Sequence, residues 1–448
     1  MRRIFLTFTA MSLAVSAAAQ SLDQATPTTN PATKAADTQS VQSRPPSTLT
    51  GEWGGLRTKL RDDGLDLTGS YGSESAWNAA GGERERLRET GQFVFGATLD
   101  TDKLIGLHGG TFQATITYRR GKDLGSDAGL GVLQQVQEVY GRGQTWRLTQ
   151  FWYDQKFAGD HADIKVGRLT QGEDFASFSC QFMNLSFCGS PPGNLVGDYW
   201  YNWPVSQWGA RLRVKNDSFY VMAGAYENNP RNLDNNFTLG HLHGATGFLL
   251  PVEVGYTPSV GVAKLPGSFK VGGWYNSSDG NDVQLDIDHQ PVAVTGLSPL
   301  RRNSRYGVYA AAQQQLTGTA ESGPTGPQTV HGLVVFANIT QTDRQTSTTD
   351  NQIAVGLFYT GLIGFRPKDD FGLAVARTNV NGRATSEVTL IAPGAERPKA
   401  EYAAELDYGV HATDWLIVRP NVQYIVDPGG FSRANDVVVF GVKGAVTF

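Results

Sequence analysis

The sequence predicts an all-β fold, a transmembrane antiparallel β-barrel of about 16 strands in the outer membrane of a Gram-negative bacterium. Three observations lead to this prediction. The chain begins with a segment typical of an export signal, apolar and polar residues alternate in many separate stretches, and residues 437–448 (VVVFGVKGAVTF) form a two-faced strand that ends on Phe448. A closing strand with a terminal aromatic residue resembles the last strand of bacterial outer-membrane barrels.

The N-terminal residues predict export. Arg2 and Arg3 precede an apolar run over 4–19 that ends on small residues suited to cleavage, which is the layout of a secretory signal peptide. This run of about 16 residues is shorter than the roughly 20 apolar residues that a transmembrane helix needs. The next segment is rich in Thr, Pro, Ser, Gln and Ala and is expected to be disordered. The predicted division is therefore a signal peptide at 1–19, a spacer at 20–48 and one barrel domain at 49–448.

The composition fits a barrel whose strands have one apolar face. The chain contains 53 glycines, 10% aromatic residues and two cysteines, and its mean hydropathy is negative. Barrel strands give a low mean hydropathy because only the lipid face is apolar. The mildly acidic net charge of −4, without a basic tract, offers no surface for nucleic acid. Composition alone also permits a secreted soluble sandwich or propeller, but a propeller would show a blade-length repeat.

Period-two alternation assigns two faces to each predicted strand. In 111–119, Phe112 and Ile116 lie on one face while Gln113 and Arg119 lie on the other. In the closing strand, Phe440, Val442 and Val446 are predicted to face lipid and Lys443 to face the interior. The other predicted strands are 93–99, 208–215, 269–275, 305–312, 333–339, 353–359, 371–377, 401–410 and 416–426. A barrel of about 16 such strands leaves an aqueous channel, whereas eight strands would be filled by side chains.

Several motifs then resemble the carbohydrate-selective porin family of the OprB type. They are LTGEWGGLR at 49–57, Gly-Arg at 167–168, WPVSQWGAR at 203–211, PNVQYIVDPGG at 420–430 and the final strand at 441–448. They occur in order over most of the chain. The resemblance implies a 16-stranded outer-membrane barrel that passes monosaccharides, often glucose, by facilitated diffusion, with a homotrimeric or monomeric assembly.

Charged residues on the polar faces of the strands are the candidate channel residues. A charge facing lipid is costly near the membrane midplane, so polar faces are expected to line the lumen. Charged groups form strong hydrogen bonds with hydroxyl groups, and an arginine can span two of them. The candidates are Arg119, Arg211, Arg213, Glu405 and Asp407, although each could also be a solvated wall charge. Arg168 has the parity of lipid-facing residues, and only a bulge or the family's Gly-Arg pattern favours the lumen.

The segment 170–206 is the candidate constriction loop. A connection of this length is usually functional, and in porins such a loop often folds into the barrel. Phe175, Trp200 and Trp203 are candidates for stacking on a sugar, or they pack the loop on the wall. Cys180 and Cys188 lie close together in an exported chain, which suggests a disulfide.

The expected function is facilitated diffusion of carbohydrates through a polar, aromatic-lined channel, without a cofactor or a metal. The partners expected are sugars and outer-membrane lipid. A channel of the same fold for a polyol, an organic acid or an oligosaccharide is the alternative, and a barrel enzyme such as a lipid hydrolase is disfavoured because no nucleophile motif is present. His241 and His243 could hold a metal, but a third ligand is missing nearby and a solvated pair is favoured.

Overall fold

Sixteen antiparallel strands close into a single barrel in the computed structural model, which describes residues 48–178, 180–323 and 326–448. The predicted signal peptide and all but the last residue of the predicted spacer lie outside the described residues. The strands of the barrel are β1 (Leu65–Ala80), β2 (Leu87–Asp100), β3 (Gly110–Gly121), β4 (Trp146–Phe157), β5 (Ala162–Leu169), β6 (Gln207–Lys215), β7 (Phe219–Asn228), β8 (Gly247–Tyr256), β10 (Leu265–Asn276), β13 (Arg305–Gln315), β15 (Gly326–Thr342), β16 (Thr349–Thr360), β17 (Asp370–Val380), β18 (Ala400–Thr413), β19 (Leu416–Val426) and β20 (Val437–Thr447). The predicted fold class is confirmed.

The remaining elements are short and lie in the connections. Two short strands, β9 (Ser259–Val260) and β14 (Thr319–Gly323), extend the barrel sheet, and β11 (Gly280–Asp286) pairs with β12 (Pro299–Arg302) in a separate hairpin. The helical segments are η1 (Trp53–Gly55), α1 (Leu56–Asp62), α2 (Thr101–Ile105), α3 (Leu124–Asp127), α4 (Gln171–Asp174), η2 (Leu185–Phe187), α5 (Pro191–Leu195), η3 (Pro230–Leu233), α6 (Val292–Thr295), α7 (Val388–Ile391) and η4 (Pro428–Gly430). Among the described residues, no helix combines the length and apolarity needed to cross a membrane.

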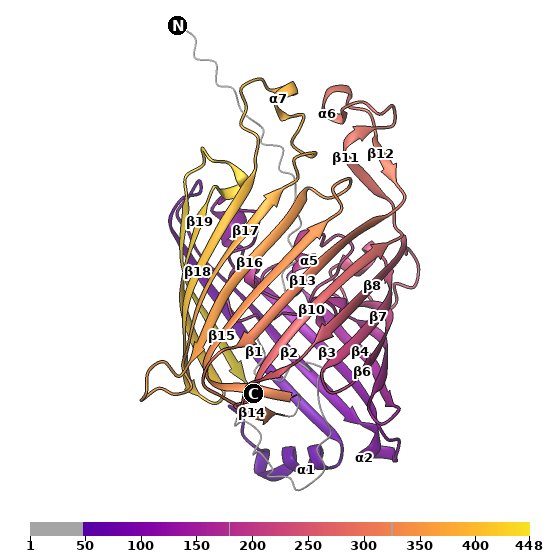
Figure 1. The fold of residues 1–448 in the computed structure, drawn as a ribbon, viewed down its shortest axis with the longest axis vertical. Coiled ribbons are helices and arrows are strands. Elements are labelled where there is room, and N and C mark those ends of the chain that lie inside the picture. Colours follow the sequence, from indigo (N-terminus) through magenta and orange to yellow (C-terminus); the bar gives the residue numbers. More distant parts are fainter. Residues whose placement is uncertain (1–47, 179, 324–325) are drawn as a thin grey trace.

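The two ends of the barrel differ in the length of their connections. The end that carries α1 and the C-terminus has short turns, such as 414–415 between β18 and β19, while β11, β12, α6 and α7 rise from the opposite end (Figure 1). Outer-membrane barrels have short periplasmic turns and long extracellular loops. The end with α1 is therefore the periplasmic one.

The barrel closes where its first and last strands meet. β20 pairs antiparallel with β1, from Ser70 opposite Thr447 to Trp77 opposite Phe440. Trp77 stacks on Phe440 at 5.8 Å between ring centroids. At the periplasmic end of this seam, the buried Arg57 of α1 donates to the main-chain oxygens of Phe448 (2.8 Å) and Leu67 (3.0 Å). The resemblance motif at 49–57 thus fastens the seam.

The strand faces follow the alternation of the sequence. Phe440 and Val442 are exposed on the outer surface of β20, and Lys443, which follows Val442, is buried. The same pattern repeats in the other predicted strands, all of which form, so the lipid face is apolar and the polar face points inward. The described structure departs from simple alternation in β4 and β5, where the candidate site begins.

Candidate channel site

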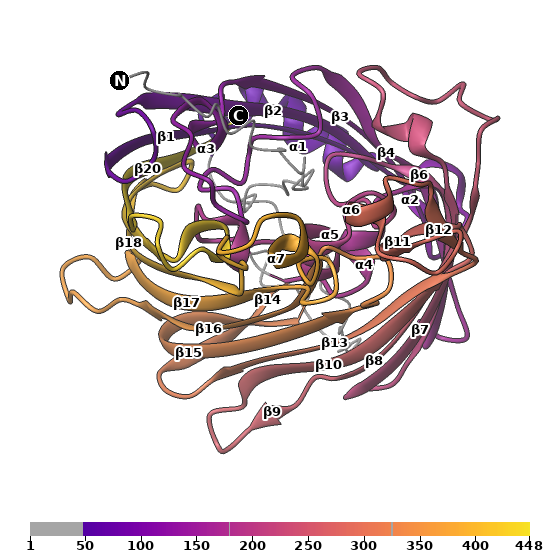
Figure 2. The ribbon, with the colours of Figure 1, turned by 90° about the horizontal axis from the view of Figure 1, so that it is seen from above.

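The connection 170–206 folds into the barrel, as the sequence predicts. Figure 2 shows α4 and α5 of this connection inside the ring of strands. Its side chains pack on the inner wall at β16 and β10: the ring centroids of Phe182 and Phe358 lie 5.3 Å apart, and those of Trp200 and Trp274 also lie 5.3 Å apart. The buried apolar residues of the barrel interior are thus shared between this loop and the inner wall.

A second connection, 122–145 between β3 and β4, joins the first one inside the barrel. The main-chain nitrogen of Glu138 donates to the Met183 oxygen (3.0 Å), and the nitrogen of Leu185 donates to the Gln135 oxygen (2.9 Å). The two connections therefore form one body, which we call the inner plug (122–145 and 170–206).

Carboxylates on the barrel wall hold the plug by its main chain. Glu405 of β18 accepts from the nitrogens of Met183 (2.8 Å) and Asn184 (2.7 Å). Glu253 of β8 accepts from Ala176 (2.8 Å) in the same way. Main-chain N–H groups buried without a partner are costly, and these carboxylates satisfy them with charge-assisted bonds.

Two more wall carboxylates accept hydrogen bonds from the main chain of the plug. Glu401 of β18 accepts from Leu133 (2.6 Å), and Glu74 of β1 accepts from Val139 (3.1 Å). Lys270 of β10 is a donor instead of an acceptor: its Nζ donates to the main-chain oxygen of Ser177 (2.6 Å). The inward charges of the wall thus position the plug from several sides.

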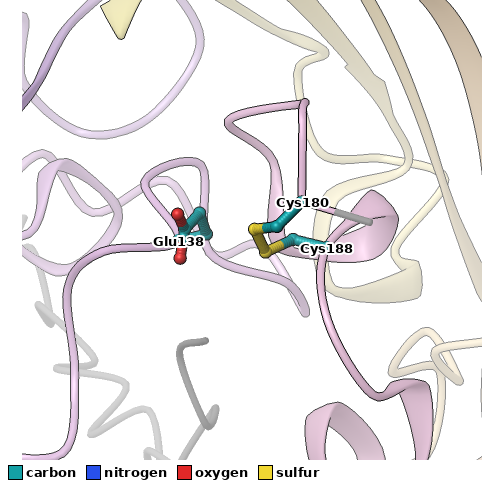
Figure 3. A group of neighbouring side chains, drawn as sticks. All are labelled: Glu138, Cys180 and Cys188. Atoms are coloured by element: carbon teal, nitrogen blue, oxygen red, sulfur yellow. A yellow bond between two sulfur atoms is a disulfide. The ribbon is translucent and has the colours of Figure 1, made fainter. Parts of the chain in front are cut away.

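Cys180 and Cys188 form a disulfide within the plug. Figure 3 shows Glu138 beside it, and the three side chains are close enough together for a metal site. Both sulfur atoms are bonded to each other, however, so neither is a thiolate ligand. Glu138 instead accepts from Lys443 Nζ (3.2 Å), which also donates to the main-chain oxygens of Cys180 and Phe182 (3.0 Å each).

Arg119 and Trp203, both predicted channel residues, meet at one glutamine. Arg119 Nε and Trp203 Nε1 donate to Gln92 Oε1 at 2.7 Å and 3.0 Å. Arg119 Nη1 also lies 3.4 Å from the main-chain oxygens of Tyr140 and Gly141 in the plug. Arg119 is fully buried and Trp203 nearly so; both connect the wall to the plug.

Arg168 is fully buried, although it pairs with the outward-facing Phe151 of β4 and keeps the parity of lipid-facing neighbours. The preceding residue, Gly167, has a φ of +132°, a conformation that residues with a side chain rarely adopt. Arg168 Nη2 then donates to the Ser206 oxygen (2.6 Å) and to Thr238 Oγ1 (2.7 Å). The pairing of β5 with β4 and with β6 has no register shift at Arg168, so the bulge that was considered is not present there, and a lumen role for Arg168 stays a prediction.

The remaining predicted residues are also buried and engaged. Arg211 and Arg213 both bind Asp163, with Arg213 Nε at 2.7 Å, and Asp407 accepts from Arg419 (2.8 Å). Phe175 and Trp200 lie fully buried in the apolar contacts of the plug. Contact between solute and these residues, or Glu405, stays a prediction, because each is covered by the plug or paired within the wall.

Four other inward residues that keep part of their surface exposed were not predicted from the sequence. They lie on β4 and α4: Gln150, Trp152, Asp154 and Glu173. β4 was not predicted because a bulge breaks its alternation. Thr115 of β3 pairs with Gln150, but the next residue, Ile116, pairs with Leu148, so Thr149 is left without a partner on β3. A cluster of Trp, Tyr and Gln over 150–155 was the available signal.

The sequence of the chain is similar to those of known porins. Residues 84–448 match the family described as "Carbohydrate-selective porin, OprB family". The chain is 42% identical over 420 residues to Porin B of Pseudomonas aeruginosa, covering 89% of this chain and 91% of the relative. It is 31% identical over 430 residues to the putative porin QuiX of Acinetobacter baylyi, covering 89% of this chain and 93% of that one.

A solved structure of Pseudomonas putida OprB at high pH superposes with a TM-score of 0.84. Its sequence is 42% identical, and the match covers 90% of this chain and 98% of that one. The fold of the barrel and the sequence comparisons therefore indicate the same family and the same location in the outer membrane. The chain belongs to the carbohydrate-selective porins of the OprB family, and it is a channel of the Gram-negative outer membrane rather than an enzyme.

Proposed function

We propose that the channel passes monosaccharides such as glucose by facilitated diffusion. The observation that carries the proposal is the pairing of charges around the half-exposed inward residues. Lys165 is bonded to Asp174 (2.6 Å) and Arg213 to Asp163 (2.7 Å), so these cations are neutralised by carboxylates beside them. Such a surface has no excess of positive charge to attract anions, and hydrogen bonding then selects among neutral solutes.

A channel for a polyol, an organic acid or an oligosaccharide is the alternative. An organic acid would need an excess of positive charge along its path. A longer sugar would need several stacking surfaces in series, and Trp152 is a single half-exposed aromatic side chain of β4 that faces inward. Both considerations favour a small neutral solute.

Liposome swelling with a panel of solutes tests the proposal. Liposomes that contain the purified porin should swell faster in glucose than in gluconate, which matches glucose in size and carries a charge, or in a trisaccharide. Equal or faster swelling in gluconate would contradict the proposal and favour the organic-acid channel. Faster swelling in the trisaccharide would favour the oligosaccharide channel.

Three further parts of the proposal concern the whole chain. We propose that residues 1–19 are removed as a signal peptide, that 20–48 remain as a spacer and that 49–448 form the transport domain. N-terminal sequencing of the protein from outer membranes checks the cleavage before Gln20. The assembly is a monomer or a homotrimer, and light scattering in detergent distinguishes the two by mass.

A further inference from the structure

The inner faces of β2, β3 and β4 place a set of polar side chains in adjacent rows. Thr98, Gln113 and Trp152 are cross-strand neighbours in one row, and Thr115 and Gln150 are neighbours in the next. Glu173 of α4 lies against Gln150 from the plug side. Except for Thr115, these side chains keep part of their surface exposed inside the barrel. Their polar groups can therefore be reached from the interior of the barrel.

A continuous chain of hydrogen bonds runs through this set. Its members, which we call the polar track, are Thr98, Gln113, Thr115, Gln150 and Glu173. Thr98 Oγ1 donates to Gln113 Oε1 (2.5 Å), and Gln113 Nε2 donates to Thr115 Oγ1 (2.8 Å). Thr115 Oγ1 then donates to Gln150 Oε1 (2.5 Å), and Gln150 Nε2 donates to Glu173 Oε1 (2.8 Å). Every donor points towards the carboxylate, so the orientation of each amide and hydroxyl is fixed in advance.

The indole of Trp152 lies beside the polar track. Its neighbour on β5 is Gly167, which has no side chain to cover the ring. Lys165 Nζ lies 4.8 Å from the ring centroid and is itself held by Asp174 (2.6 Å). The indole is thus fixed on one side by a cation–π contact, next to polar groups that keep free donor and acceptor positions.

We propose that Trp152 and the polar track form a carbohydrate subsite on the periplasmic side of the plug. The apolar face of a pyranose ring packs on the indole, while its hydroxyl groups bond to Gln113, Gln150 and Glu173. Aromatic rings combine a large apolar surface with a defined orientation, and the amides of the track accept and donate in fixed directions. This inference rests on the proposed function, because it names where that solute is held in passage.

Block of ion current by glucose tests the subsite. Glucose is titrated against the current through the full-length porin in planar bilayers, and the half-blocking concentration is compared between variants. Trp152→Ala is expected to raise this concentration about threefold to tenfold, the effect of losing one aromatic contact. Trp152→Phe should recover most of the block, and Gln113→Leu should raise the half-blocking concentration severalfold. Phe151→Ala is the matched control, because Phe151 is the neighbouring residue of β4 on the outer face.

The outcomes separate the two proposals. A wild-type current that glucose does not affect contradicts the proposed function and the subsite together. A wild-type current blocked by glucose, with the same half-blocking concentration in Trp152→Ala and Gln113→Leu, overturns the subsite alone. Insertion is checked by heat-modifiable mobility on gels. If Trp152→Ala does not fold, Gln113→Leu decides, and an unchanged half-blocking concentration in that variant overturns the subsite.

Discussion

Glu173 is a carboxyl group with an unusual environment at the edge of the open space. It lies in α4 of the plug, with Gln150 bonded to one oxygen and Lys165 and Asp174 nearby. Burial raises the pKa of Glu173 to about 7, and Asp174 adds to the rise while Lys165 opposes it. Its charge therefore changes near neutral pH.

Ion selectivity should follow this titration. Above pH 7 the charged carboxylate favours cations, and below pH 7 the neutral acid removes that preference. The reversal potential in a KCl gradient should therefore shift towards cation preference between pH 6 and pH 8. Glu173→Gln should abolish the shift. Glu396→Gln is the control that should keep it, because hydrogen bonds from Ser432 hold the pKa of Glu396 below its ordinary value.

The same group links pH to stability. The folded protein binds the proton of Glu173 more tightly than the unfolded chain does, because the pKa is raised on folding. Its contribution to stability is therefore complete below the ordinary carboxyl range and is lost as pH rises through about 7.

The ion-selectivity measurement has a clear contrary outcome. A reversal potential that shifts equally in wild type and Glu173→Gln would show that another group carries the titration.

At the scale of the elements, the position of the plug depends on strand residues that accept hydrogen bonds from its main chain. Glu405 bonds to two consecutive residues, Met183 and Asn184, and the disulfide between Cys180 and Cys188 encloses that stretch. The cross-link stiffens the loop locally, whereas Glu405 attaches it to β18. Attachment and stiffness are thus supplied by different residues.

Glu405→Ala should loosen the plug without opening the barrel. The variant leaves the N–H groups of Met183 and Asn184 unpaired, at a cost of about 1–3 kcal/mol for each. Single-channel recordings should show larger current noise and a higher mean conductance. Glu85→Ala, which changes a carboxylate in the loop between β1 and β2, should leave both values unchanged. A Glu405→Ala channel as quiet as wild type would contradict the role of Glu405 as an anchor.

Sequence patterns were sufficient for the strands and insufficient for the site. Alternation in 111–119 and 401–410 assigns Arg119 and Glu405 to the inner face, and both lie there. Alternation cannot say which inner residues the plug covers, because that depends on contacts between segments far apart in the chain. Trp152 escaped notice because a bulge breaks the pattern of β4. Arg168 has the parity of outward-facing residues and is nevertheless buried, so alternation alone does not say what its side chain contacts.

At the scale of the whole molecule, one buried arginine connects the beginning and the end of the chain where the barrel closes. Arg57 Nη1 bonds to the Phe448 oxygen (2.8 Å) and to Thr48 Oγ1 (2.7 Å), and Nη2 bonds to the Leu67 oxygen (3.0 Å). Arg57→Ala removes all three bonds and should destabilise the barrel by about 1–3 kcal/mol. The temperature of half-conversion on heat-modifiable gels should fall by several degrees.

The exposed Lys59 of α1 provides the control for this measurement. Lys59→Ala should convert at the wild-type temperature, because it removes a charge from the same helix without touching the seam. Equal temperatures for Arg57→Ala and wild type would mean that the pairing of β1 with β20 closes the barrel unaided.

The bond between Arg57 and Phe448 joins residues 391 positions apart. Contacts of such separation form late, because a long stretch of chain must first be ordered between the two partners. Interactions absent from the transition state act mainly on the rate of unfolding and little on the rate of folding. Arg57 should therefore contribute to the lifetime of the inserted barrel: a porin without it would assemble at nearly the normal speed and open sooner.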